Sequence, residues 1–103
     1  AWLPAMTDLL RSGELVGAVL EQNGEYVSGA VIQGAEDGEL AGVWTLPQKQ
    51  RQGLSYMLCR RLLDDYFSKG QTLCWLSAAE GALRLYEKLG FKRVGTQLNF
   101  QLA

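Results

Sequence analysis

A short loop, Gln50–Ser55, combines residues that suit the binding of a phosphate group. It follows a strand-like run that ends at Pro47, and it opens a long amphipathic helix. The first N–H groups of a helix lack partners within the helix and lie at the positive end of its dipole, so they attract anions. Gly53 would let a ligand approach the backbone, and Arg51 and Lys49 would add positive charge. An ordinary strand-to-helix turn has the same composition, so the loop alone leaves both interpretations open.

A second motif lies at the end of a later helix, where Leu85-Tyr86-Glu87-Lys88-Leu89-Gly90-Phe91 carries a tyrosine, stops at a glycine and enters a strand. Together with Thr45-Leu46-Pro47 before the loop and Ala82-Leu83-Arg84 before the tyrosine, the two motifs resemble the Gcn5-related N-acetyltransferase (GNAT) family. The resemblance runs from about Leu40 to the C-terminus. It implies an α+β (mixed α/β) acyl-CoA N-acyltransferase fold, a mixed central sheet flanked by helices, acetyl-CoA as cosubstrate and no metal.

The resemblance also implies which residues hold the cofactor. The resemblance implies that the pyrophosphate is bound mostly by the backbone N–H groups of six successive residues: Gln50, Arg51, Gln52, Gly53, Leu54 and Ser55. It also implies that the main chain at Val43 and Thr45 binds the pantetheine arm and the thioester carbonyl. The sequence is equally consistent with ordinary strand residues at these two positions. Ser55 stands where the family usually has Gly or Ala, and its hydroxyl would bond a phosphate or cap the helix. Ala79 stands where the family often has an Asn that bonds the pantetheine arm.

The implied reaction is a direct attack of a primary amine on the thioester. Tyr86 resembles the tyrosine that protonates the leaving thiolate, while its other interpretation is core packing beside Leu85. Glu39 is the candidate general base, on the strand beside the thioester, and would otherwise be an exposed charge at a strand start. Trp44 and Trp75 would line the acceptor pocket or belong to the core.

Composition excludes several other classes of site and partner. The chain contains no histidine, which excludes Ser-His-Asp and Cys-His catalysis and a His-ligated metal. Cys59 and Cys74 fall inside a helix and a strand, which favours buried apolar residues in a reducing compartment, the cytoplasm, over the alternative of a disulfide. A net charge of −1 gives no field for nucleic acid, and no apolar run approaches the roughly 20 residues that span a bilayer. We expect a small-molecule or peptide amine as partner, with a homodimer left open.

The spacing of apolar residues predicts the elements that position these motifs. They are a short helix Leu3–Leu10, an antiparallel meander of strands Leu15–Gln22, Tyr26–Gln33 and Glu39–Thr45, a helix Gln52–Phe67, a strand Thr72–Leu76, a helix Ala79–Leu89, and strands Phe91–Val94 and Thr96–Leu102. Asn23-Gly24 is a strong hairpin turn signal. Crossovers around Thr72–Leu76 predict parallel pairing there, and the resemblance implies a sheet splayed beside that strand, with acyl-CoA in the gap.

A length of 103 residues supports one domain, residues 1–103. Measured against the family, this domain is expected to lack the first strand and helix, which help form the acceptor site. Two alternatives to an enzyme therefore stand. One is a non-catalytic acyl-CoA-binding module, or the C-terminal half of a two-part acetyltransferase. The other is an interaction domain that pairs through an exposed sheet edge.

Overall fold

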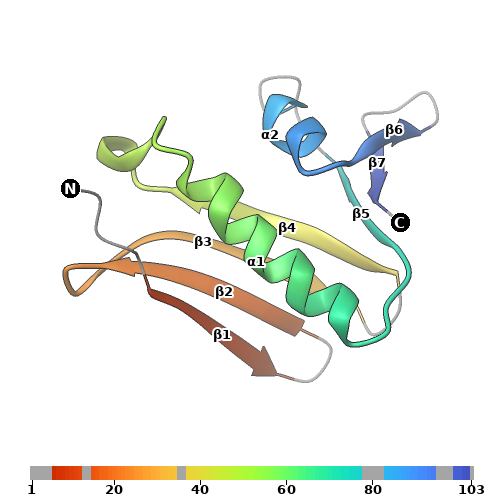
Figure 1. The fold of residues 1–103 in the computed structure, drawn as a ribbon, viewed down its shortest axis with the longest axis horizontal. Coiled ribbons are helices and arrows are strands. Elements are labelled where there is room, and N and C mark those ends of the chain that lie inside the picture. Colours follow the sequence, from red (N-terminus) through yellow and green to blue (C-terminus); the bar gives the residue numbers. More distant parts are fainter. Residues whose placement is uncertain (1–5, 13–14, 35–36, 78–82, 95–98, 103) are drawn as a thin grey trace.

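The computed structural model describes residues 6–12, 15–34, 37–77, 83–94 and 99–102. Figure 1 shows their arrangement. The elements in chain order are β1 (Met6–Ser12), β2 (Leu15–Gln22), β3 (Glu25–Gln33), β4 (Gly38–Thr45), the 3-10 turn η1 (Pro47–Lys49), α1 (Leu54–Ser68), β5 (Cys74–Ser77), α2 (Leu83–Lys88), β6 (Lys92–Val94) and β7 (Asn99–Leu102). The α+β class predicted from the sequence is confirmed.

The described strands form one mixed sheet in the order β1-β2-β3-β4-β5-β7-β6. Strands β1 to β4 are successive antiparallel neighbours, whereas β4 and β5 run parallel. The parallel pairing spans only two positions, Gly38 with Cys74 and Glu39 with Trp75. Beyond them the two strands separate, and β5 turns away from the line of β4 (Figure 1). The predicted mixed sheet, with a gap between these strands, is confirmed.

The predicted N-terminal helix is wrong for the described part of Leu3–Leu10. Residues from Met6 onward form β1, which pairs with β2 from Met6 opposite Glu21 to Ser12 opposite Leu15. A segment this short gains little from helix formation, so the hydrogen bonds of a long adjacent strand override its helix-like apolar spacing. The meander therefore contains four strands. That the chain lacks the family's first strand and helix stays a prediction.

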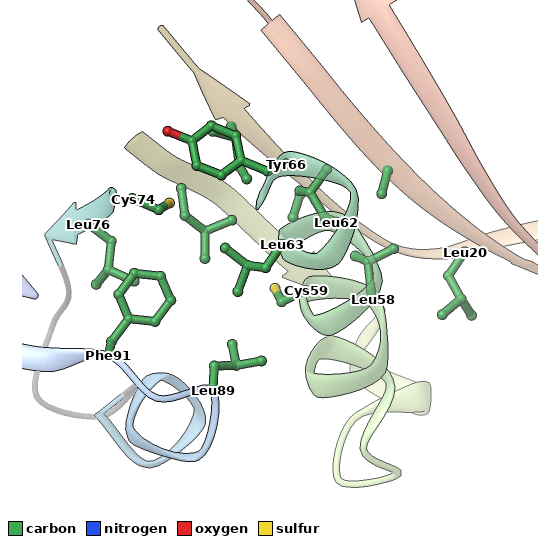
Figure 2. Close-up of a cluster of buried hydrophobic side chains, with 14 of the residues drawn as sticks. Leu20, Leu58, Cys59, Leu62, Leu63, Tyr66, Cys74, Leu76, Leu89 and Phe91 are labelled. Carbon is green, nitrogen blue, oxygen red and sulfur yellow. The ribbon is translucent and has the colours of Figure 1, made fainter. Parts of the chain in front are cut away.

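Helix α1 lies across one face of the sheet and forms the centre of the core (Figure 1). Its buried side chains are Leu54, Leu58, Cys59, Leu62, Leu63 and Tyr66, which contain the four-residue stripe predicted from the sequence. Figure 2 shows this stripe between Leu20 on one side and Leu76, Leu89 and Phe91 on the other. One helix therefore joins the meander to the C-terminal strands, so its N-terminus is held beside the gap in the sheet.

The remaining elements agree with the sequence to within a few residues. Asn23 and Gly24 have φ angles of 52° and 80°, as a two-residue hairpin turn requires. The helix predicted over Ala79–Leu89 is described as Leu83–Lys88, and Ala79 lies outside the described residues. Within the described part of the chain, no helix is long and apolar enough to cross a membrane.

Candidate functional site: a cationic cleft at the start of α1

The loop between β4 and α1 uses two residues with left-handed backbone to turn the chain. Arg51 has a φ of 64° and Gly53 a φ of 76°. Gly53 is the N-cap of α1 and provides no side-chain hydrogen bond, while its carbonyl accepts from Met57 N–H at 3.0 Å. The N–H groups of the first turn, residues 54–56, therefore point beyond the helix without a capping side chain. A Cβ on Gly53 would meet no atom within 4 Å, so the backbone there is open to a ligand.

A cleft of about 440 Å³ opens at this loop and reaches across to α2. Its lining residues are Thr45, Lys49, Gln50, Arg51, Gly53, Leu54, Ser55, Tyr56, Arg84, Leu85 and Lys88. Among these described lining residues four are cations and none is a carboxylate, so this part of the cleft concentrates positive charge in a chain whose net charge is −1. The structure thus brings Arg51 and Lys49 together with two cations that the sequence reasoning missed. The sequence shows that Arg84 and Lys88 are four residues apart on the tyrosine helix and share one face, but it does not show that this face meets the loop.

Most of the predicted cofactor residues lie on this cleft. Thr45, Gln50, Arg51, Gly53, Leu54 and Ser55 line it. Gln52 is exposed within the loop, and Val43 is half-buried in β4; neither belongs to the lining. Gln50 also braces the loop, because its Nε2 donates to the Thr45 carbonyl at 3.2 Å. That carbonyl is therefore already engaged within the protein.

Three hydroxyl groups connect β3, β4 and the first turn of α1. Ser28 Oγ donates to the Trp44 carbonyl at 2.7 Å and lies 2.9 Å from Thr45 Oγ1, which lies 2.5 Å from Ser55 Oγ. Each hydroxyl has one proton, and that of Ser28 is used on the carbonyl. Thr45 must then donate to Ser28, and Ser55 must donate to Thr45. The Ser55 proton therefore points into the protein, so this hydroxyl donates no hydrogen bond to a ligand phosphate. Helix α1 also has no side-chain hydrogen bond at its N-cap.

Strand β4 carries a bulge next to the gap in the sheet. Gly29 pairs with Trp44, and Val31 pairs with Ala41. Between these two pairs, β4 contains one residue more than β3. Gly42, with a φ of 58°, adopts the left-handed conformation that the irregularity needs. Because β5 pairs with β4 only up to Glu39, the main chain beyond it has no strand partner on the β5 side within the described residues. An extended ligand would find unpaired peptide groups there, as the role predicted for Val43 requires.

Tyr66 closes the other end of this gap. Its hydroxyl accepts from the Gly38 N–H at 2.8 Å and donates to the Leu73 carbonyl at 2.5 Å. These two groups lie at the starts of β4 and β5, where the strands pair. Burial raises the pKa of Tyr66, so the hydroxyl keeps its proton and the bond to Leu73. The sequence indicated only a core residue here, since its spacing does not reveal the polar role.

Tyr86 is fixed by the way α2 ends. Phe91 N–H donates to the Tyr86 carbonyl at 3.0 Å and Gly90 N–H to the Glu87 carbonyl at 3.0 Å, the pair of bonds of a Schellman motif. The Tyr86 hydroxyl makes no hydrogen bond within the described residues, yet no buried side-chain oxygen among them lacks a partner, so it reaches solvent. Burial of the side chain, and then the nearby Cys59, raise the pKa of Tyr86. Tyr86 is not among the residues that line the cleft.

The structure places Glu39 away from the cleft. It pairs with Trp75 at the closed end of the gap, and its Oε1 lies 3.5 Å from Gln33 Nε2. Thr45 is six residues further along β4, roughly 20 Å for an extended strand. Trp44 is 42% exposed, which excludes it from the core. Neither tryptophan lines the cleft.

Comparison with known proteins identifies the family. The profile of the acetyltransferase (GNAT) family matches residues 2–91. The chain belongs to this family. A [ribosomal protein bS18]-alanine N-acetyltransferase from Salmonella typhimurium is 31% identical over 68 residues, which cover 63% of this chain and 46% of that protein. This GNAT chain therefore spans about half the length of that relative.

Solved structures show the same fold. The ribosomal-protein-S18-alanine N-acetyltransferase from Escherichia coli superposes with a TM-score of 0.74 and 26% identity, covering 88% of this chain and 68% of that one. PaiA N-acetyltransferase from Thermoplasma acidophilum, in complex with coenzyme A, has a TM-score of 0.76 and 15% identity, covering 85% and 60%. The GNAT fold predicted from the two motifs is confirmed.

The cleft fits the cosubstrate that the GNAT fold implies. Coenzyme A carries a pyrophosphate and a 3′-phosphate, and the cleft offers four cations together with the open N–H groups of a helix start. Within the described part of the chain, no group of three His, Cys, Asp or Glu side chains is placed to hold a metal ion.

Proposed function

We propose that this GNAT protein transfers an acetyl group from acetyl-CoA to a primary amine by direct attack of the amine on the thioester. The observation that carries the proposal is the cleft at the start of α1, where the described lining contains Lys49, Arg51, Arg84 and Lys88 and no carboxylate. A site of this kind favours a ligand with several phosphate charges. Its position beside the gap between β4 and β5 gives the rest of the ligand a route along the unpaired edge of β4.

In this proposal the protein contributes orientation and hydrogen bonding rather than a covalent intermediate. The main chain at the β4 bulge, around Val43, orients the thioester, and Tyr86 returns a proton to the leaving sulfur. The raised pKa of Tyr86 supports that role, because the hydroxyl stays protonated throughout the neutral range. Glu39, at the closed end of the gap, is the candidate that accepts the proton of the amine.

The acceptor is proposed to be an amine on a peptide or small molecule. Two similar proteins are named as alanine N-acetyltransferases of a ribosomal protein, which supports testing a peptide that begins with alanine first. A cytoplasmic location is part of the same proposal, supported by two free, buried cysteines, Cys59 and Cys74. Measurement of the molecular mass in solution would show whether the protein forms a homodimer.

The experiment incubates the purified chain with acetyl-CoA and an alanine-initiated peptide, and follows thiol release together with the mass of the peptide. The matched control is the same peptide with a blocked N-terminus. Acetylation of the free peptide alone is expected. Saturable binding of CoA without transfer to any of a panel of amines would contradict an enzyme and favour the non-catalytic module or a two-part protein. A stable dimer that binds no CoA would favour the interaction domain.

A further inference from the structure

One face of the sheet is covered by no helix within the described residues. Helix α1 packs on β2, β3 and β4, and α2 packs against α1, so both helices lie on the same side (Figure 1). Ala18, Ala30 and Leu40 point to that side and are buried, so their neighbours along each strand point away from it. We call the outward-pointing residues within three ranges the open face: 15–19 of β2, 29–33 of β3 and 39–44 of β4.

The open face is largely apolar, although a sheet face in contact with water is normally polar. Its most exposed apolar members are Leu15, at 38%, and Trp44, at 42%. Its polar side chains are those of Gln33 and Glu39, which lie at one end of the face with Nε2 and Oε1 3.5 Å apart. A contiguous apolar surface of this kind is rare on a monomer, so the open face indicates an interaction surface.

Two glycines keep the open face flat. Trp44 pairs with Gly29 across the β4 bulge, and a Cβ on Gly29 would collide with the Trp44 Nε1, so the indole lies directly against β3. The indole N–H has no hydrogen-bond partner within the described residues. A Cβ on Gly17 would lie 3.3 Å from Cγ1 of Val31, which stands at the centre of the face. The face therefore offers a shallow apolar surface and one unused hydrogen-bond donor.

The open face is complementary to itself. A half turn about an axis that passes over Val31 and runs across the strands would place each end of the face over the opposite end. Leu15 would then meet Val19 of a second copy. Glu39, at the polar end, would meet Trp44 of the second copy, where the carboxylate can accept from the free indole N–H. Apolar contacts and the polar pair are thus satisfied by the same rotation.

We propose that the open face is the interface of a two-fold symmetric dimer, in which two copies of this chain pack sheet against sheet. The broad side of the protein measures 41 × 30 Å, which exceeds the roughly 800 Å² that each partner buries in a stable interface. The open face contains one carboxylate and no cation, so it does not favour a charged partner such as nucleic acid or a lipid headgroup. The cationic cleft lies on the side of α1 and α2, so both copies keep it open, and the dimer is independent of the proposed function.

The test measures the mass of the whole chain in solution by analytical ultracentrifugation at micromolar concentrations. The wild type should have the mass of two chains. Leu15→Lys places a charge in the interface and should raise the dissociation constant of the dimer by at least about a hundredfold. The matched control is Tyr56→Lys, because Tyr56 is also 38% exposed but lies on α1, and this variant should stay a dimer. Circular dichroism establishes that both variants are folded.

The polar contact has its own variant. Trp44→Phe keeps an aromatic ring over Gly29 but removes the N–H that faces Glu39, so it should weaken the dimer by about tenfold. A folded wild-type chain that is a monomer throughout would overturn the inference and leave the open face to a different partner. A dimer that survives Leu15→Lys would also overturn it and indicate pairing through another surface, such as the edge of β1.

Binding of CoA separates this inference from the proposed function. Leu15 lies outside the cleft, so Leu15→Lys should bind CoA with the affinity of the wild type, within about twofold. A wild-type dimer that dissociates on Leu15→Lys would support the interface whether or not CoA binds. A monomeric wild type that binds CoA would overturn the interface and leave the proposed function intact.

Discussion

Tyr86 and Phe91 are joined twice: the Phe91 N–H donates to the Tyr86 carbonyl at 3.0 Å, and the two rings meet edge to face with centroids 6.2 Å apart. Gly90, with a φ of 101°, supplies the left-handed residue that lets the helix end this way. The spacing from tyrosine to Gly-Phe is therefore a structural requirement. The hydrogen bond holds the Tyr86 main chain and the contact with Phe91 holds its ring, while its hydroxyl has no hydrogen-bond partner within the described residues.

Tyr86→Phe should separate the structural and chemical roles of this residue. The substitution keeps the ring contact and the helix end, so the free energy of unfolding should change by less than about 0.5 kcal/mol. Loss of the proton donor should lower the rate of acetyl transfer by about a hundredfold, with the affinity for acetyl-CoA unchanged. Steady-state kinetics and calorimetry measure the two quantities. An undiminished rate would show that the hydroxyl is not the acid.

Tyr66→Phe should destabilise the fold although it removes one oxygen atom only. The Gly38 N–H and the Leu73 carbonyl would lose their shared partner inside the protein, which costs about 1–3 kcal/mol. Urea denaturation gives the change in the free energy of unfolding. Tyr26→Phe is the matched control, because Tyr26 is 58% exposed and should tolerate the same change within about 0.5 kcal/mol. Equal effects of the two substitutions would contradict the role of Tyr66 at the closed end of the gap.

Ser55→Ala should affect stability more than cofactor binding. The Ser55 hydroxyl donates to Thr45, so its loss breaks the chain of three hydroxyls and costs about 1 kcal/mol of stability. Because the proton does not point toward the cleft, the dissociation constant for CoA should rise less than about threefold. A rise of tenfold or more, with stability unchanged, would show that the hydroxyl contacts the phosphate.

Stability should fall as the solution becomes alkaline. Burial raises the pKa of Cys59 from 9.0 to about 12, with a further contribution from Cys74, and burial raises that of Cys74 to about 12. Between pH 9 and 12 the unfolded chain releases protons that the folded chain keeps, so each thiol lowers the free energy of unfolding by up to about 1.4 kcal/mol per pH unit.

Below pH 8 these thiols should have no effect on the pH dependence of stability. Urea denaturation at pH 7, 9 and 10.5 measures the slope. Cys59→Ala removes one of the two buried thiols and should give a shallower slope over the same range, whatever its effect on stability at pH 7. A slope that is identical with and without Cys59 would contradict the assignment.

The sequence predicts the parts of this protein that depend on local patterns. The stripe from Leu54 to Tyr66, the Asn23-Gly24 turn and the Gly90 helix end are each encoded within a few neighbouring residues, and the structure contains them. The first strand was predicted as a helix because its apolar spacing is ambiguous, and only its pairing with β2 decides its conformation.

The same holds for the site: neighbouring residues in the sequence identify some of its members, and only tertiary packing brings in the others. Gly53 and Arg51 can be recognised from the loop alone, since helix starts of this kind suit anions. Arg84 and Lys88 join them only through the packing of α2 against α1, which no local pattern reports. The two bonds of Tyr66 likewise connect residues 28 and 7 positions away in the chain, and its place on the apolar stripe of the helix predicts only a core residue.

The most direct test of the account is calorimetric titration of the purified chain with acetyl-CoA and with CoA, repeated on Gly53→Asp. Gly53 has open space where a side chain would begin, so aspartate places bulk and negative charge in the cleft without displacing protein atoms, at a cost in stability of about 1–2 kcal/mol from the left-handed backbone. The account predicts saturable binding to the wild type and a loss of at least a hundredfold in affinity in the folded variant. Absence of binding to a folded wild-type chain, or equal binding to both proteins, would contradict the assignment of the cleft.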